Sequence, residues 1–444
     1  MATAHDTATD DRAADPPAFG EGLIGTLLGG DGLRAIAALM IFFGHVFVNA
    51  DPGQAFENYG WAKDIVGRLD LGLGLFFALS GYLITRPFLR SFILDTKRPD
   101  VRRFARNRVL RIVPAFYVMA AIVLLRFGLD GAISPTPDNP SGTGPASAWW
   151  QVLSVFTFTQ SYTGGSATLP LGQAWSLDAE AAFYIAIPIA AAIAYRLAGT
   201  RIRTPPARAK AAFAFIVGLG LVSIFLRQGS DRFAVLTSPP FIVYAFVPGI
   251  ALAALEPLAA PWLRKDPKRA IRLGWALFAV AALAWILYSS WDYAAQTTAL
   301  HHALGRRALM AIAFSGAVLA AVMAWQLGTE RSPRWLATRA IRWLGERSYA
   351  IYLLHVWVLF EVIAIVGTGT STTTLAIAMI ALGLPATLVL SQLSWRFVEQ
   401  PCLRRRVRWA PGEPTPGPGT RPPGEAHASV QPGVGDPQPE RALP

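Results

Sequence analysis

The stretch LRAIAALMIFFGHVFVNA, Leu33 to Ala50, is apolar for almost its whole length but contains an arginine at its second position and a histidine in its second half. A helix that crosses the hydrocarbon core of a bilayer, about 30 Å thick, needs roughly 20 predominantly apolar residues. Ionisable side chains inside such helices are rare and mark functional sites by default. The stretch therefore predicts a membrane span that carries part of a site, with His45 as its first candidate residue.

Apolar runs of this kind recur along the whole chain of 444 residues. Hydrophobic residues make up 53% of it and charged residues 15%, against about 25% charged residues in soluble proteins. The candidate spans are at about 33–50, 68–86, 112–129, 173–195, 211–227, 239–256, 273–289, 304–326, 347–366 and 374–397. The run 149–160 is too short to cross and is expected to be re-entrant or interfacial. The chain is thus predicted to be an all-α, polytopic integral membrane protein with about ten transmembrane helices.

The distribution of basic residues predicts the orientation. Most of the 40 Lys and Arg residues lie in loops on one side of the ten spans, together with the C-terminal tail. The positive-inside rule assigns this side to the cytoplasm, so both termini are expected there, in a multi-pass protein of a bacterial cytoplasmic membrane. The net charge of +12 follows mainly from this topology, and we expect no nucleic-acid partner.

The two ends of the chain differ from its apolar middle. Residues 1–30 are polar and acidic without the basic start of a signal peptide, and residues 405–444 are rich in proline and glycine. Both are expected to be disordered and cytoplasmic, flanking a ten-helix membrane domain at residues 31–404. The single cysteine, Cys402, excludes an intramolecular disulfide and a cysteine metal cluster, so no metal site is predicted.

Few ionisable residues lie deep within the predicted spans: His45, Glu180 with Asp178, His355 and Glu361. At a rise of about 1.5 Å per residue, His45, Glu180 and His355 fall near the middle of three different helices, where they could line one polar cavity. The alternative for Glu180 and for His355 is a structural hydrogen bond to a neighbouring helix. Asp178 is two residues from Glu180, cannot share its helix face, and is expected to be structural or interfacial.

The spacing between Arg34 and His45 predicts a shared face. Eleven residues are almost three helical turns, which places the two side chains on one side of the helix and about 16 Å apart along its axis. An arginine at the membrane surface can hold phosphate, and a histidine at mid-depth can act as a base in a dry site. Acyl-coenzyme A, with phosphates at one end and a reactive thioester on a long arm, would bridge the two positions.

Six motifs carry a resemblance to a known family. They are GLRAIAALMIFFGH (32–45), LFFALSGYLIT (75–85), RNRVLRIVPAFY (106–117), WSLDAEAAFY (175–184), LGERSYAIYLLHVWV (344–358) and WRFVEQPCLR (395–404). In this order, over about residues 30–404, the chain resembles the acyltransferase-3 family of integral membrane O-acyltransferases. It departs from the family pattern at Gly74, where many members have an acidic residue and this chain has Asp70 one turn earlier. It also has Ala181 where a second glutamate often follows Glu180.

The resemblance implies transfer of an acetyl or other short acyl group from acyl-coenzyme A, as co-substrate, to a hydroxyl. The acceptor would be a carbohydrate, such as a cell-envelope polysaccharide or glycan, or a secondary metabolite such as a macrolide. No permanently bound cofactor is expected. His45 would be catalytic with Glu180 in an acidic role, and the remaining site residues would bind the substrates: Arg34, Arg108, Arg111, Ser80, Trp175, Ser176, Tyr184 and His355. The soluble hydrolase-like domain that some members carry is not expected here.

The chemistry predicted from these residues is direct transfer. His45 would take the proton of the acceptor hydroxyl, whose oxygen would attack the thioester while a thiolate leaves, with Glu180 or His355 orienting the base or the acceptor. A two-step route through an acyl-serine at Ser80 is chemically open, although a Ser-Gly pair in a span is more often a packing face. The rival class is a polytopic transporter or exporter of a small molecule or lipid-linked sugar, since midplane ionisable residues also occur in carriers.

Overall fold

The computed structural model describes residues 27–51, 59, 62–127, 149–162, 172–198, 201–227, 236–289, 300–367 and 369–408, and its regular structure there is helical throughout. The α-helices are α1 (Gly30–Ala50), α2 (Lys63–Val66), α3 (Leu71–Leu94), α4 (Val101–Phe127), α5 (Trp149–Phe156), α6 (Trp175–Ala198), α7 (Pro205–Arg227), α9 (Pro239–Ile242), α10 (Val247–Arg264), α11 (Pro267–Ser289), α12 (Leu300–Thr329), α13 (Arg339–Glu346), α14 (Ser348–Val366), α15 (Thr372–Ala378), α16 (Leu384–Ser394) and α17 (Gln400–Arg408). The predicted disordered ends lie almost wholly outside the described residues, although α17 continues the helix to Arg408, beyond the predicted domain end at 404.

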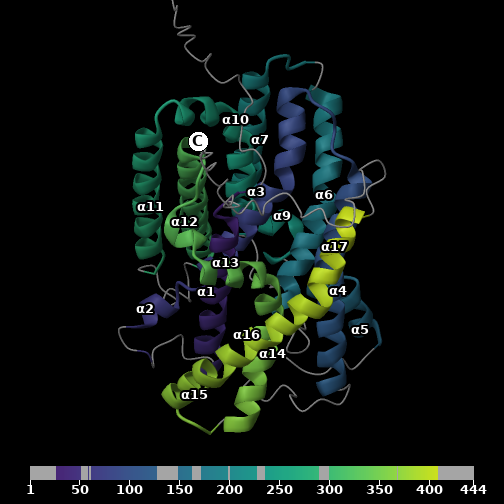
Figure 1. The fold of residues 1–444 in the computed structure, drawn as a ribbon, viewed down its shortest axis with the longest axis vertical. Helices are drawn as coiled ribbons and strands as arrows, with labels where there is room; N and C mark the ends of the chain where they lie inside the picture. The colour runs from purple at the N-terminus through teal and green to yellow at the C-terminus, as the bar shows by residue number, and fades with distance from the viewer. Residues whose placement is uncertain are drawn as a thin grey trace, which may run out of the picture.

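The prediction of about ten membrane helices is confirmed. Within the described residues nine helices are long and apolar enough to span a membrane, and a bent pair at Pro239–Ala245 and Val247–Arg264 makes a tenth. The run at 149–160 forms the short helix α5 and a 3₁₀ turn at Gln160–Tyr162, so it does not span. The α10–α11 connection and the adjoining ends of α6 and α7, which belong to two of the basic loops, lie at the same end of the bundle (Figure 1). That this end is cytoplasmic stays a prediction from charge.

The bend between Pro239–Ala245 and Val247–Arg264 has a local cause. Its two parts meet at 56° across Phe246, two residues before Pro248, which lacks the N–H that would continue the helical hydrogen bonding. The next residue, Gly249, packs against the backbone of α3, because a Cβ added there would lie 1.8 Å from the carbonyl oxygen of Ala78. The bend therefore brings α10 into backbone contact with α3.

This contact is reinforced by a buried ion pair. Arg86 on α3 donates to both carboxylate oxygens of Glu256 on α10, at 2.7 and 2.9 Å, and the Tyr82 hydroxyl donates to Glu256 at 2.9 Å. Glu256 is 2% exposed, so the pair is shielded from water. Truncating one partner of such a pair leaves a buried charge uncompensated, so we expect either truncation to weaken the packing of α3 on α10.

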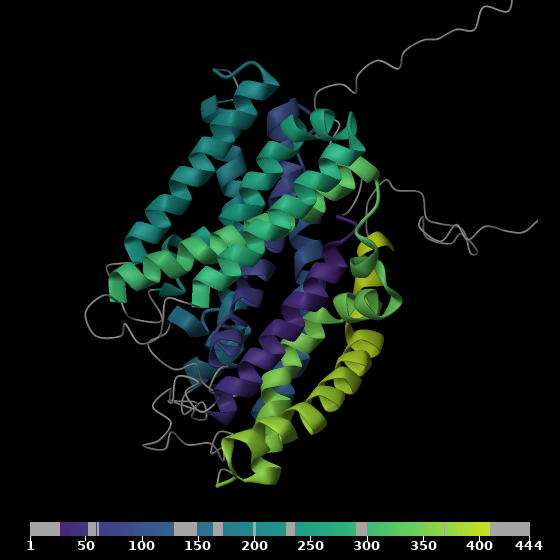
Figure 2. The same ribbon diagram turned by 90° about the vertical axis from the view of Figure 1, so that its left-hand side faces the viewer.

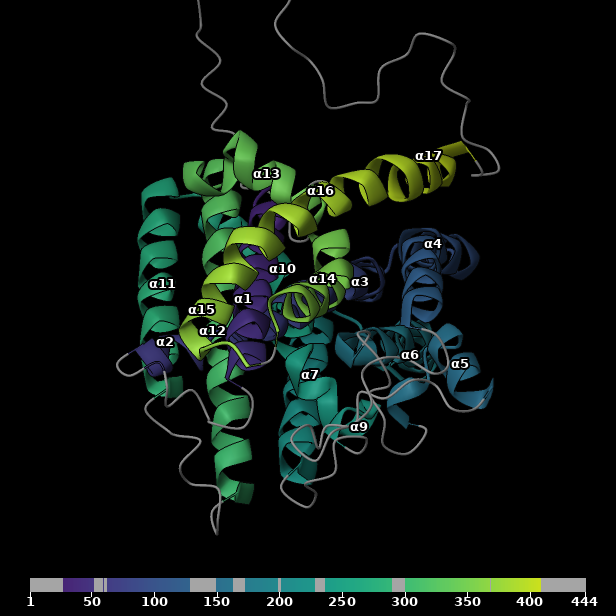
Figure 3. The same cartoon turned by 90° about the horizontal axis from the view of Figure 1, so that it is seen from below.

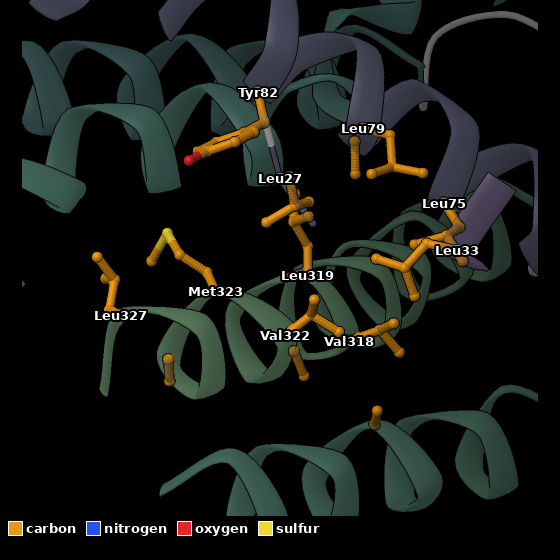
Figure 4. Packing of buried hydrophobic residues seen from close by; sticks show 14 of the residues in the cluster. Leu27, Leu33, Leu75, Leu79, Tyr82, Val318, Leu319, Val322, Met323 and Leu327 are labelled. Carbon is orange, nitrogen blue, oxygen red and sulfur yellow. The ribbon is translucent and has the colours of Figure 1, made fainter. Parts of the chain in front are cut away.

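Helix α1 runs through the centre of the bundle, between α12 on one side and α14 and α3 on the other (Figure 3). It contacts α3, α13, α14 and α15. Figure 4 shows Leu33 of α1 beside Leu75 of α3, in an apolar cluster that also contains Leu79 of α3 and Leu319 and Val322 of α12. The helix that carries Arg34 and His45 is thus packed against α3, α13 and α14, and its residue Leu33 is fully buried.

The C-terminal helices wrap along one edge of the bundle, as the yellow-green ribbon of Figure 2 shows. The segment from α15 to α17 contains two π-helical turns, Met379–Gly383 and Trp395–Glu399, and α17 packs against α4. π-Helical turns are rare and often lie at functional sites. Here the second one brings Glu399, 4% exposed, toward α4, which carries two of the predicted arginines.

Candidate active site

Two neighbouring cavities contain most of the predicted site residues. The first, of about 80 Å³, is lined by Arg34, Arg108, Arg111, Glu180 and other residues; the second, of about 210 Å³, is lined by His45. The lining residues Leu73 and Tyr352 belong to both, so these two side chains form the partition between them. The single polar cavity expected from the sequence is therefore divided in two, with Arg34 on one side of the partition and His45 on the other. We call the first cavity, lined by Arg34, the arginine cavity and the second, lined by His45, the histidine cavity.

His45 pairs with His355. Nε2 of His355 lies 3.3 Å from Nδ1 of His45, and the ring centroids are 4.8 Å apart. His355 is fully buried, at 0% exposed, and its Nδ1 lies 2.7 Å from the carbonyl oxygen of Tyr352 and 3.1 Å from that of Ile351. Of the two residues that the sequence offered as partners of His45, the structure brings His355 into contact.

The surroundings of the two rings determine their tautomers. Carbonyl oxygens only accept hydrogen bonds, so Nδ1 of a neutral His355 carries the proton and its Nε2 is left as an acceptor. Nδ1 of His45 faces two acceptors, this Nε2 and the carbonyl oxygen of Ile41 at 3.0 Å, and therefore carries its own proton. The basic nitrogen of His45 is then Nε2. The chain of hydrogen bonds from Tyr352 through His355 thus prepares His45 to accept a proton.

The arginine cavity combines three cations from two helices. Helix α4 begins after Asp100, whose carboxylate accepts from the backbone N–H groups of Arg102 and Arg103 as an N-cap. Arg108 and Arg111 follow three residues apart and so lie on one helix face. Arg34 joins them from α1, held by Asp31 at 3.2 Å with 23% of its side chain exposed. Such a cluster suits an anionic group, because guanidinium groups bind phosphate through paired, charge-assisted hydrogen bonds.

Glu180 lies in the arginine cavity, where its carboxylate is held by two hydroxyls. The Ser80 hydroxyl donates to Oε1 at 2.8 Å, and the Tyr184 hydroxyl donates to the same oxygen at 2.6 Å. Arg108 stacks over the ring of Tyr184, with its guanidinium carbon 5.5 Å from the ring centroid. The carboxylate thus shares this cavity with the arginines, whereas His45 lines the other cavity. Ser80 points into the cavity, and the neighbouring Gly81 forms the packing contact, against Phe246.

Tyr352 is a site residue that the sequence did not single out. Its hydroxyl lies 2.6 Å from the hydroxyl of Ser176 and donates to the carbonyl oxygen of Gln173 at 2.5 Å, which ties α14 to the start of α6. Ser176 lines the arginine cavity, whereas the adjacent Trp175 lines the histidine cavity. The signal was present, because Tyr352 lies three residues before His355 in the fifth motif.

The remaining ionisable candidates have structural partners. Asp178 accepts from the backbone N–H of Ser161 at 2.9 Å and from its hydroxyl, which anchors the 3₁₀ turn after α5 to α6. Glu361 pairs with Arg126 at 3.0 Å and accepts from the indole of Trp357 at 3.0 Å. Asp178 therefore has the structural role expected for it, and Glu361 joins α14 to α4 away from both cavities. Among the described residues no cluster of three His, Cys, Asp or Glu side chains could hold a metal ion.

The arrangement can support one kind of chemistry in particular. An anionic substrate held by the arginines would extend its far end toward Leu73 and Tyr352, and a group in the histidine cavity would meet it there. A neutral imidazole in that cavity can remove a proton from a hydroxyl, and general-base action of this kind contributes about 10²–10⁴-fold to a rate.

Comparison with known proteins places this geometry in a family context. A family model described as an acyltransferase domain matches residues 28–396. The chain is 26% identical over 382 residues to the peptidoglycan O-acetyltransferase OatA of Listeria monocytogenes and 28% identical over 376 residues to a putative peptidoglycan O-acetyltransferase of Bacillus subtilis. These alignments cover 84% of this chain but 55% and 54% of the relatives, so the chain spans about half the length of the curated relatives it matches. No solved structure matches the chain.

Proposed function

The chain belongs to the acyltransferase family whose model it matches, and we propose that it transfers an acetyl or other short acyl group from acyl-coenzyme A to a hydroxyl of a carbohydrate. Two relatives are named for peptidoglycan, which favours a glycan of the cell envelope over a secondary metabolite such as a macrolide. The observation that carries the proposal is the pair of cavities on either side of Leu73 and Tyr352, one lined by three arginines and the other by His45.

The arginine cavity is the proposed donor site. Arg34, Arg108 and Arg111 outnumber Glu180 among the charged residues that line it, which favours an anion. Its volume of about 80 Å³ is below the range of about 300–1,000 Å³ usual for drug-sized ligands, so it takes the narrow arm and adjoining phosphate rather than the whole coenzyme. The nucleotide end would lie outside it, on the face that the charge distribution assigns to the cytoplasm. Donor and acceptor then approach the partition from opposite directions.

The proposed reaction is direct transfer with His45 as the base. Nε2 of His45 takes the proton of the acceptor hydroxyl as its oxygen bonds to the thioester carbonyl carbon. The tetrahedral intermediate then collapses, the carbon–sulfur bond breaks, and the thiolate leaves and takes up the proton from the His45 imidazolium. His355 is a positioning residue, since it holds the proton of His45 on Nδ1 and thereby keeps Nε2 free to act.

Glu180 and Ser80 define the alternative route. Because the Ser80 hydroxyl donates to Glu180 at 2.8 Å, Glu180 can take the hydroxyl proton while Ser80 accepts an acyl group from a donor in the arginine cavity. The direct route predicts that Ser80→Ala retains transfer and that no acyl group remains on the protein after the donor is exhausted. An acyl-protein trapped in the absence of acceptor, and lost in Ser80→Ala, would replace the direct route with the two-step one.

The experiment that tests the function uses the purified full-length protein in lipid nanodiscs. Acetyl-coenzyme A with a radiolabelled acetyl group is incubated with candidate hydroxyl compounds, and labelled product is separated from donor. Label on an acceptor, lost in His45→Ala at unchanged folding, supports the proposal. Transport of an unmodified compound by reconstituted vesicles without transfer of label would favour the transporter class instead.

A further inference from the structure

A third cavity adjoins the histidine cavity. It has a volume of about 300 Å³ and is lined from α3, α6, α7, α11 and α12 and the turn before α10. It shares Asp70, Leu73 and Trp175 with the histidine cavity, so the space around His45 continues past these three residues. Together the two spaces fall within the range of about 300–1,000 Å³ usual for small-ligand sites. We call it the Asp70 cavity.

Asp70 lies between the histidine cavity and the Asp70 cavity, and its carboxylate can still accept hydrogen bonds from a ligand. Its Oδ2 accepts from the Tyr288 hydroxyl at 2.5 Å and from Nη2 of Arg307 at 2.9 Å. Its side chain is nevertheless 48% exposed, and an ionised carboxylate has about four lone-pair positions. Two donors to Oδ2 therefore fix its orientation, and the residue lines both cavities.

Other hydrogen-bond acceptors and donors line the histidine cavity and the Asp70 cavity. Gln173, 5% exposed in the histidine cavity, donates to the carbonyl oxygen of Leu353, but its own Oε1 has no hydrogen-bond partner among the described residues. A buried acceptor without a partner is costly, so this oxygen needs a donor from a bound water molecule or a ligand. On the far wall, the Arg227 guanidinium donates to the carbonyl oxygen of Leu236 at 2.9 Å and stacks over Tyr244, 4.9 Å from the ring centroid.

We propose that the Asp70 cavity is the acceptor subsite and that Asp70 selects the acceptor, by binding hydroxyls of the sugar ring next to the one that is acylated at His45. This inference rests on the proposed function. A sugar ring presents hydroxyls around its edge and C–H groups on its faces. The acceptors Asp70 and Gln173, the donor Arg227 and the aromatic side chains of Trp175, Tyr244 and Tyr288 match that pattern. Because a site built to bind hydroxyls leaves buried polar groups unpaired with an apolar ligand, it discriminates against a largely apolar macrolide.

Two variants test the subsite by different means. Asp70→Asn removes the charge at nearly constant shape. Gly74→Leu fills the cavity, and Gly74→Ala is its matched control, because a Cβ there meets only Ala311 at 3.9 Å. Asp64→Asn, an exposed acidic position on α2 outside the three cavities, controls for the loss of a charge.

The measurement is equilibrium binding of a radiolabelled N-acetylglucosamine tetrasaccharide to the full-length protein in nanodiscs, with acetyl-coenzyme A binding measured in parallel. We expect Asp70→Asn and Gly74→Leu each to raise the tetrasaccharide Kd about tenfold or more, the controls to leave it unchanged, and the donor Kd to stay constant. An unchanged tetrasaccharide Kd in both variants overturns the inference, and so does a wild-type protein that binds a macrolide lactone but not the sugar. Because binding needs no turnover, a protein that binds the sugar through Asp70 but transfers no acyl group refutes the proposed function and leaves the subsite standing.

Discussion

Replacing His355 by alanine tests the role of the histidine pair. The variant removes the acceptor that lies 3.3 Å from Nδ1 of His45, while the carbonyl oxygen of Ile41 remains at 3.0 Å and still favours the same tautomer. One neutral hydrogen bond contributes about 0.5–1.5 kcal/mol net. If the transition state loses this hydrogen bond, the free energy corresponds to about a 2- to 13-fold fall in kcat. Loss of the base itself in His45→Ala is expected to cost about 10²–10⁴-fold.

The assay is the initial rate of acetyl transfer at saturating donor and acceptor. His355→Gln is the matched variant, because its side-chain oxygen can take the place of Nε2 as the acceptor for His45, and we expect it to recover most of the rate. Since His355 is fully buried, thermal melting and size-exclusion profiles of each variant separate a lost hydrogen bond from a lost fold. A fall in kcat as large as that of His45→Ala would contradict a purely positioning role for His355, and an unchanged kcat would remove it from the mechanism.

Two further predictions concern the donor site and the packing of α3 on α10. Arg108→Gln should raise the KM for acetyl-coenzyme A by about 10- to 150-fold, because it removes one charge-assisted hydrogen bond, and should change kcat less. An unchanged KM in initial-rate measurements would contradict the assignment of the arginine cavity as the donor site. Gly249→Ala places a Cβ 1.8 Å from the carbonyl oxygen of Ala78 and should lower the free energy of unfolding by about 1–3 kcal/mol or more. Gly218→Ala, where a Cβ meets nothing within 4 Å, should keep the melting temperature or raise it slightly, and equal melting of the two variants would show that α3 and α10 are not in backbone contact.

The fold was largely predictable from the sequence because lipid restricts the options. Backbone polar groups in a bilayer must be satisfied internally, so each long apolar run of the sequence became a helix. The bend at Phe246 was not predicted. Pro248 was visible in the sequence, but the close approach of Gly249 to Ala78 depends on where α3 lies, which one sequence does not contain.

The members of the site were predictable largely from the family motifs. Arg34, Arg108 and Arg111, which the family motifs indicated as substrate-binding residues, line one cavity, and Ser80, Ser176, Glu180 and Tyr184 line it with them. The contacts of His45 were a different matter. Depth counting placed Glu180 and His355 near its level, but only the rotation of α6 and α14 about their axes decides which of them touches it.

Asp70 illustrates the same limit. Its position one turn before Gly74 left open whether it takes the place of the family's acidic residue. The structure holds it with Tyr288 of α11 and Arg307 of α12, two helices whose sequences carry none of the six family motifs. A residue whose partners lie more than 200 positions away could be placed only by the tertiary structure.

The central claim is that His45 is the base that activates an acceptor hydroxyl for acyl transfer. Its most direct test is a single-turnover experiment in which an excess of full-length enzyme, wild type or His45→Ala, is mixed with radiolabelled acetyl-coenzyme A and saturating N-acetylglucosamine tetrasaccharide. We predict that His45→Ala binds the donor with unchanged Kd but transfers its acetyl group about 10²–10⁴-fold more slowly. Transfer by His45→Ala at the wild-type rate would contradict the account.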